Sequence, residues 1–168
     1  MTARYKINQE EIREFLTKCS PETKVYLGCD SERFKMKGKW YADYVLSVVV
    51  HIDGYKGCKI FGEVHRELDY DQNIERPFTR MMTEAQKVAQ LYLDLKEVLH
   101  DFEVEVHVDI NPKEDAGSSC AYQAAVGYIK GVCNVTPMAK PDAFSASYAA
   151  DRLKGLGLVK YHPESEAA

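Results

Sequence analysis

The chain has 168 residues, a formal net charge of −4 and 45% hydrophobic residues. This size and composition suit one globular domain, which we expect over residues 1–160, with a flexible C-terminal tail over 161–168. The negative charge excludes a broadly basic surface for nucleic acid, because phosphate neutralisation needs clustered Lys and Arg, but it allows a local basic patch. No apolar run approaches the roughly 18 residues of a membrane span, so we expect a soluble, cytoplasmic protein.

The cysteines and histidines show no pattern of a disulfide scaffold or a zinc site. Five cysteines are scattered along the chain without a CxxC pair, which is typical of reduced thiols in a cytosolic protein. The five histidines lack the HxxxH or Cys/His spacing of zinc ligands. Chemistry based on bound zinc or on structural disulfides is therefore not expected.

The first predicted element is an amphipathic helix over residues 9–19, preceded by the capping pair Asn8 and Glu11. A strand follows that alternates from Val25 and ends near Asp30. Two more strands are predicted, over residues 42–52, which are rich in Val, and over 59–67. A turn over residues 53–57 separates the last two strands, and we expect an antiparallel meander.

The second half of the chain reads as helices alternating with strands. A long helix is predicted from Pro77 to about residue 100, and a strictly alternating strand over 103–110 ends near Asp109. The remaining predictions are a helix over 118–129, a short strand over 132–137 and a last helix that begins at Pro141 and stops at Gly155 and Gly157.

This order predicts an α/β fold with a mixed five-stranded sheet in the strand order 3-2-1-4-5. A strand–helix–strand crossover is normally parallel and right-handed, so the fourth strand should lie parallel to the first. Asp30 and Asp109 would then meet at neighbouring carboxyl ends, where open sheets place ligand chemistry.

Two further acids are expected on buried helix faces. Val88, Leu91 and Leu95 lie within about 40° of Glu84 around its helix, so Glu84 falls on the apolar stripe. In the last helix, the same geometry favours Asp142 over Asp151 as the acid that faces the core.

Each of these acids also has a structural alternative. Asp142 could complement a helix N-terminus, Asp30 could cap a turn, and Glu84 could pair with a core Arg or Lys. Their joint placement nevertheless favours one shared site built from Asp30, Glu84, Asp109 and Asp142. A set of oxygen ligands without Cys or His predicts a hard cation, Mg²⁺ or Mn²⁺, with Asp30 as the acid that bridges two ions in phosphodiester chemistry.

Four segments resemble a known family. They are VYLGCDSERF from Val25, TEAQKVAQLYLDL from Thr83, VHVDINP from Val106 and KPDAFSASYAAD from Lys140. Together they are similar to the YkuK-like family of the ribonuclease H-like superfamily, predicted nucleases related to RuvC and YqgF, over about residues 5–155. The resemblance implies a nuclease-like fold and the same four catalytic and metal-binding carboxylates, while fold alone does not fix activity. Asp151 also matches the last segment and could serve a supporting role.

Several polar residues near these acids are candidate substrate contacts. Basic and aromatic residues alternate in an expected loop after Asp30, where they could meet phosphates and bases, although an ordinary solvated hairpin is an equal alternative. Ser31 and Asn111, which follow Asp30 and Asp109, could hydrogen-bond to the metal-binding acids, or they could simply form turns. The candidates are Ser31, Arg33, Lys35, Asn111, Lys113 and Lys140, and Lys37 and Lys39 adjoin them.

The sequence thus predicts a metal-dependent nuclease that acts on DNA, RNA or a hybrid and can exist as a monomer or oligomer. The main alternative is a non-catalytic nucleic-acid-binding or scaffold module with the same fold. A phosphotransferase of the actin-like kind is disfavoured because the chain lacks a Gly-rich phosphate loop and a second domain.

Overall fold

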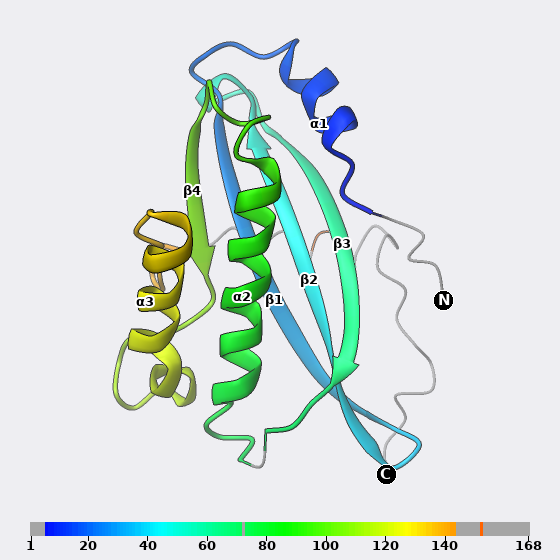
Figure 1. The fold of residues 1–168 in the computed structure, drawn as a ribbon, viewed down its shortest axis with the longest axis vertical. Coiled ribbons are helices and arrows are strands. Elements are labelled where there is room, and N and C mark those ends of the chain that lie inside the picture. The colour runs from blue at the N-terminus through cyan, green and yellow to red at the C-terminus, as the bar shows by residue number, and fades with distance from the viewer. Residues whose placement is uncertain (1–5, 72, 144–151, 153–168) are drawn as a thin grey trace.

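A computed structural model describes residues 6–71, 73–143 and 152 of the chain. In these residues, four strands form one mixed sheet in the order β3-β2-β1-β4 (Figure 1). The strands are β1 (Lys24–Met36), β2 (Lys39–His51), β3 (Cys58–Leu68) and β4 (Glu103–Val108). β1, β2 and β3 pair antiparallel, and β4 pairs parallel with β1. The predicted α/β class and the order of the first four strands are confirmed.

The helices are gathered on one face of this sheet. They are α1 (Gln9–Leu16), α2 (Phe78–Leu95) and α3 (Tyr122–Cys133), with short 3-10 turns η1 (Ile52–Gly54) and η2 (Gly117–Ala121). α2 crosses the sheet and packs on β1, β2 and β4, and α3 lies beside α2 (Figure 1). None of the helices in the described ranges has the length and apolarity needed to cross a bilayer.

Hydrophobic spacing explains how the core forms. The side chains of Met81, Ala85, Val88 and Leu95 recur on one stripe of α2 and are almost fully buried against the sheet. At the start of the chain, the amide oxygen of Asn8 accepts hydrogen bonds from two N–H groups of α1, as its sequence predicts. The five cysteines are free thiols.

The first strand is much longer than expected. β1 continues past Asp30 to Met36 and returns into β2 through a two-residue turn at Lys37 and Gly38, whose φ angles are 49° and 76°. Two consecutive positive φ angles are the geometry of a tight hairpin turn. The residues after Asp30 therefore form strand and a hairpin turn instead of the loop that we expected, and their contact with nucleic acid stays a prediction. This hairpin extends beyond the end of β3 at the bottom of Figure 1.

The predicted fifth strand over 132–137 is not found in the described part of the chain. α3 continues to Cys133 and ends at Asn134, which adopts the left-handed conformation. The chain then meets the free edge of β4 as a single parallel bridge, in which Met138 exchanges backbone hydrogen bonds of 2.8 and 2.9 Å with Val106 and Val108. This bridge lies beside β4, where the fifth strand was expected. Most of the predicted last helix, with Gly155 and Gly157, lies outside the described residues, as does the tail.

Candidate functional site

Three of the four predicted carboxylates come from elements that converge. Asp30 lies in β1, Glu84 lies in α2, and Asp109 directly follows β4. Cys29 and Val108 are the last partners in the parallel β1–β4 register. The next residues, Asp30 and Asp109, therefore lie at the same end of the paired strands. The negative charges of Asp30 and Asp109 both raise the pKa of Glu84, which places the three groups within one electrostatic environment.

Glu84 is the most buried of these acids. Glu84 is only 3% exposed, and this burial is the main cause of the raised pKa of its carboxyl group. The Ser31 hydroxyl donates a hydrogen bond to Oε1 of Glu84, which acts in the opposite direction on the pKa. Oε2 is buried and has no hydrogen-bond partner among the described residues. A buried carboxylate oxygen without a partner is costly, so this atom is suited to a cation.

Arg80 supports this pair from one turn earlier on α2. Its Nη1 donates to the backbone oxygen of Ser31 at 3.3 Å and to the Ser31 hydroxyl at 3.0 Å. Its positive charge lowers the pKa of Glu84, but less than burial raises it. Sequence reasoning missed Arg80, although its i, i+4 spacing from Glu84 places both residues on one helix face. Arg80 thus acts on Glu84 through its charge and through the shared Ser31 hydroxyl, and direct pairing of Glu84 with a core cation stays an alternative.

The start of α2 is fixed by an acid from the preceding segment. The Asp71 carboxylate accepts hydrogen bonds of 2.8 Å from the N–H groups of both Thr79 and Arg80. Asp71 therefore satisfies two of the unpaired donors at the helix N-terminus and holds Arg80 in place. Sequence reasoning missed this cap because Asp71 lies eight and nine residues before its partners.

Arg33, which we expected to contact substrate, is engaged within the protein. It forms an ion pair with Asp69, donates to the backbone oxygen of Asp71 at 3.3 Å, and lies 4.0 Å from the centre of the Trp40 ring. Its Nη1 is buried without a hydrogen-bond partner in the described residues. Arg33 therefore ties the β1–β2 hairpin to the segment before α2.

Besides Ser31, Lys140 is a predicted contact residue that touches one of the acids. Its Nζ is 2.5 Å from Oδ1 of Asp109. This ion pair with Asp109 is the main cause of the raised pKa of Lys140, and the charges of Asp30 and Glu84 add to it. An ammonium group thus neutralises part of the negative charge of the three acids.

Asp142 is not on a buried face. It is exposed, and its N–H donates to the backbone oxygen of Ala139 in a turn. Asp142 itself is therefore not buried as expected, and the helix positions that should continue its stripe lie outside the described residues. Asp151 lies outside the described residues, so the choice between the two acids as the fourth ligand stays a prediction.

The other candidate contacts remain near the surface. Lys113 is exposed, and its N–H donates to Oδ1 of Asn111 at 3.0 Å, which is the turn geometry that we weighed as the alternative. The Nζ of Lys35 lies 5.9 Å from the centre of the Trp40 ring. Within the described ranges, Asn111, Lys113 and Lys35 make these contacts rather than hydrogen bonds or ion pairs with the acids.

The three acids offer only oxygen donors to a metal ion. Across the described ranges, no group of three or more His, Cys, Asp or Glu side chains is arranged so that it could hold a metal ion. The chemistry of Asp30, Glu84 and Asp109 nevertheless suits a hard divalent cation, because all donors are oxygens and Oε2 of Glu84 lacks a partner. The donor types fit Mg²⁺ or Mn²⁺, and in this arrangement Lys140 supplies the positive charge.

Comparison with known families identifies the fold. The profile of the family described as ribonuclease H-like matches residues 8–154. The chain belongs to the ribonuclease H-like family. No curated protein and no solved structure matches it. The ribonuclease H-like assignment agrees with the YkuK-like resemblance of the four segments and with the observed mixed sheet.

Proposed function

We propose that this ribonuclease H-like protein is a metal-dependent nuclease that hydrolyses phosphodiester bonds of nucleic acid. The observation that carries the proposal is the buried, unpartnered Oε2 of Glu84 beside the charges of Asp30 and Asp109. Placing the half-buried Asp30 and Asp109 beside the buried Glu84 carboxylate is unfavourable unless a cation compensates their charges. A catalytic metal site gives a reason for this arrangement.

In the proposed site, Asp30, Glu84 and Asp109 hold Mg²⁺ or Mn²⁺, and Asp142 or Asp151 adds a fourth carboxylate. A divalent cation bound there supplies an activated water and neutralises charge that develops on the phosphate. Ser31 and Arg80 fix the orientation of the Glu84 carboxylate through their hydrogen bonds.

Other polar residues of the chain serve the substrate in this proposal. Lys140 is 42% exposed and can leave Asp109 to meet a phosphate oxygen. Lys35, Lys113 and Asn111 extend the contacts outward along the nucleic acid.

A non-catalytic nucleic-acid-binding module is the second candidate. Two observations favour it. Lys140 forms an ion pair with Asp109, and no three His, Cys, Asp or Glu side chains in the described ranges are arranged to hold a metal ion. In this role the acids would be neutralised by the protein itself, and the fold would serve as a scaffold for binding.

One screen separates the two functions. Labelled single strands, duplexes, RNA–DNA hybrids and branched junctions are incubated with Mg²⁺ or Mn²⁺, and cleavage is followed by electrophoresis. We expect the wild type and Asp101→Asn to cut, because Asp101 is 88% exposed and outside the site, and we expect Asp30→Asn and Glu84→Gln to be inactive. Full cleavage by Asp30→Asn contradicts the proposal, and binding without cleavage by the wild type favours the scaffold role.

A further inference from the structure

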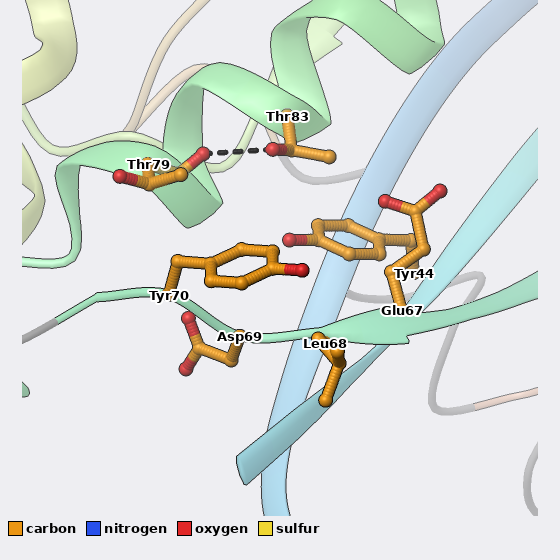
Figure 2. Close-up of a pocket in the computed structure, with 7 residues that line it drawn as sticks. All are labelled: Tyr44, Glu67, Leu68, Asp69, Tyr70, Thr79 and Thr83. Atoms are coloured by element: carbon orange, nitrogen blue, oxygen red, sulfur yellow. Dashed lines mark hydrogen bonds between the residues drawn. The ribbon is translucent and has the colours of Figure 1, made fainter.

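A pocket of about 390 Å³ opens between the end of β3 and the first turns of α2 (Figure 2). Its lining is mostly aromatic and polar. The residues are Tyr44, Glu67, Leu68, Asp69, Tyr70, Thr79 and Thr83. We call it the Tyr44–Tyr70 pocket.

The Tyr44–Tyr70 pocket adjoins the carboxylate site. Tyr44 is the direct β2 partner of Ser31 on β1, and Ser31 hydrogen-bonds to Glu84. Burial raises the pKa of Tyr44 to about 12, and Glu84 is among the charges that add to this shift. A molecule bound in the pocket would therefore lie next to the site where the proposed reaction takes place.

The walls suit a flat, uncharged, aromatic group. Tyr70 is 70% exposed, and Figure 2 shows its ring and that of Tyr44 running in opposite directions, each hydroxyl turned toward the other residue. The Thr79 and Thr83 side chains add hydroxyl groups from α2, and their residues are joined by a hydrogen bond from the Thr83 hydroxyl to the Thr79 backbone oxygen. Exposed aromatic faces stack on nucleobases without regard to sequence, and hydroxyls can meet their edges.

The charges argue against a phosphate inside the pocket. Its two acids, Glu67 and Asp69, form ion pairs with Lys87 and Arg33, so the lining offers a phosphate no spare positive charge. Positive charge lies beside the pocket, on the β1–β2 hairpin. Lys35, Lys37 and Lys39 lie there, and the Asp69 N–H donates to the backbone oxygen of Trp40 at 3.0 Å, which joins the hairpin to the pocket rim. Phosphates can follow the hairpin while a base enters the pocket.

We propose that the Tyr44–Tyr70 pocket binds one unpaired nucleobase of the nucleic acid that is acted on at the adjoining carboxylates. The inference rests on the proposed function and deepens it, because it assigns the substrate a single-stranded segment or a base that is splayed out of a duplex. A base that remains in a stacked pair has both faces covered and cannot use the Tyr70 ring.

The test measures binding rather than cleavage. A labelled single-stranded oligonucleotide, an oligonucleotide of the same length with abasic sites, and a blunt duplex are titrated with the protein in EDTA, and fluorescence anisotropy is read. The variants are Tyr70→Ala, Tyr70→Phe and the control Tyr55→Ala. Tyr55 is 72% exposed, similar to Tyr70, but follows η1 at the opposite end of β3.

We expect Tyr70→Ala to weaken single-strand binding by about 5- to 150-fold, the range of one lost stacking contact. Tyr70→Phe and Tyr55→Ala should keep wild-type affinity, and the abasic strand should bind wild type and Tyr70→Ala equally. Unchanged single-strand affinity in Tyr70→Ala, or an equal loss on the abasic strand and duplex, overturns the inference. If the expected pattern is found but Mg²⁺ and Mn²⁺ produce no cleavage, the nuclease proposal fails and the base pocket stands.

Discussion

The Ser31 hydroxyl donates a hydrogen bond to Oε1 of Glu84 and thereby joins β1 to α2 across the buried face of the sheet. Ser31 continues the alternation of Leu27 and Cys29, whose side chains belong to the core that α2 covers, so Ser31 is directed at the helix. The contact makes Ser31 a residue that holds the Glu84 carboxylate in one orientation. Four experiments follow from this site and from the rest of the fold.

The first concerns Ser31 itself. Ser31→Ala leaves the buried Glu84 carboxylate without this donor, so the free energy of unfolding should fall by about 1–3 kcal/mol. Urea denaturation of the wild type, both single variants and the Ser31→Ala/Glu84→Gln double variant gives the coupling between the two side chains. Strictly additive effects of the two substitutions contradict an energetic link between them.

The second concerns metal and stability. If Mg²⁺ or Mn²⁺ binds only the folded protein, a concentration 100-fold above Kd should add about 2.7 kcal/mol to the free energy of unfolding and raise the melting temperature. Asp30→Asn should remove most of this shift. Without metal, the variant should be as stable as the wild type or slightly more stable, because one charge that repels Glu84 is gone. Calorimetric melting with and without EDTA tests both statements, and a full metal shift in the variant contradicts the first.

The third concerns Lys140, whose ammonium occupies the neighbourhood of the acids. Because a cation must compete with this group at Asp109, Lys140→Gln should bind Mg²⁺ or Mn²⁺ more tightly than the wild type in isothermal titration calorimetry. Lys113→Gln is the control, since Lys113 is an exposed lysine whose removal deletes the same charge away from Asp109. Weaker cation binding by Lys140→Gln alone would mean that Lys140 organises the acids instead of competing for them.

The fourth concerns acid stability at a different place. The Ser20 N–H donates to Asp53 at 2.9 Å, and this bond, with Lys56, lowers the pKa of Asp53 from 3.8 to about 2. Because the folded pKa is below the unfolded one, the charge stabilises the fold fully above the unfolded pKa. This stabilisation is lost as pH falls from about 4 to about 2.

Asp53→Asn is the matched variant, because Asn keeps an acceptor oxygen and tolerates the positive φ of 54° at this position. The difference in free energy of unfolding between wild type and Asp53→Asn should be constant near neutral pH and shrink through this acid window. Urea unfolding over a pH series measures it. A difference that does not change with pH contradicts the assigned role of the Asp53 charge.

Much of the fold followed from periodicity, because burial on one face repeats with the geometry of each element. The alternation before Asp109 correctly predicted β4. The apolar stripe that includes Glu84 correctly predicted that Glu84 is buried on α2. The parallel pairing of β4 with β1 followed from the handed crossover through α2.

What could not be predicted depends on contacts between distant residues. The continuation of β1 beyond Asp30 is decided by pairing with β2, in which polar residues such as Glu32 and Arg33 face Asp43 and Ala42. The cap at Asp71 and the ion pair of Arg33 with Asp69 join segments whose sequence separation hides them. The secondary-structure propensity of a short segment does not predict such contacts, because pairing with distant residues overrides it.

The turn at Lys37 and Gly38 also determines where the chain can change length. A residue inserted at this turn would be absorbed at the far end of the hairpin, since the strand pairs on the near side keep their register. An insertion between Lys24 and Asp30 would instead shift every later side chain of β1 to the opposite face and move Asp30 and Ser31 out of position together. The hairpin tip can thus change length without moving the carboxylates, and the preceding half of the same strand cannot.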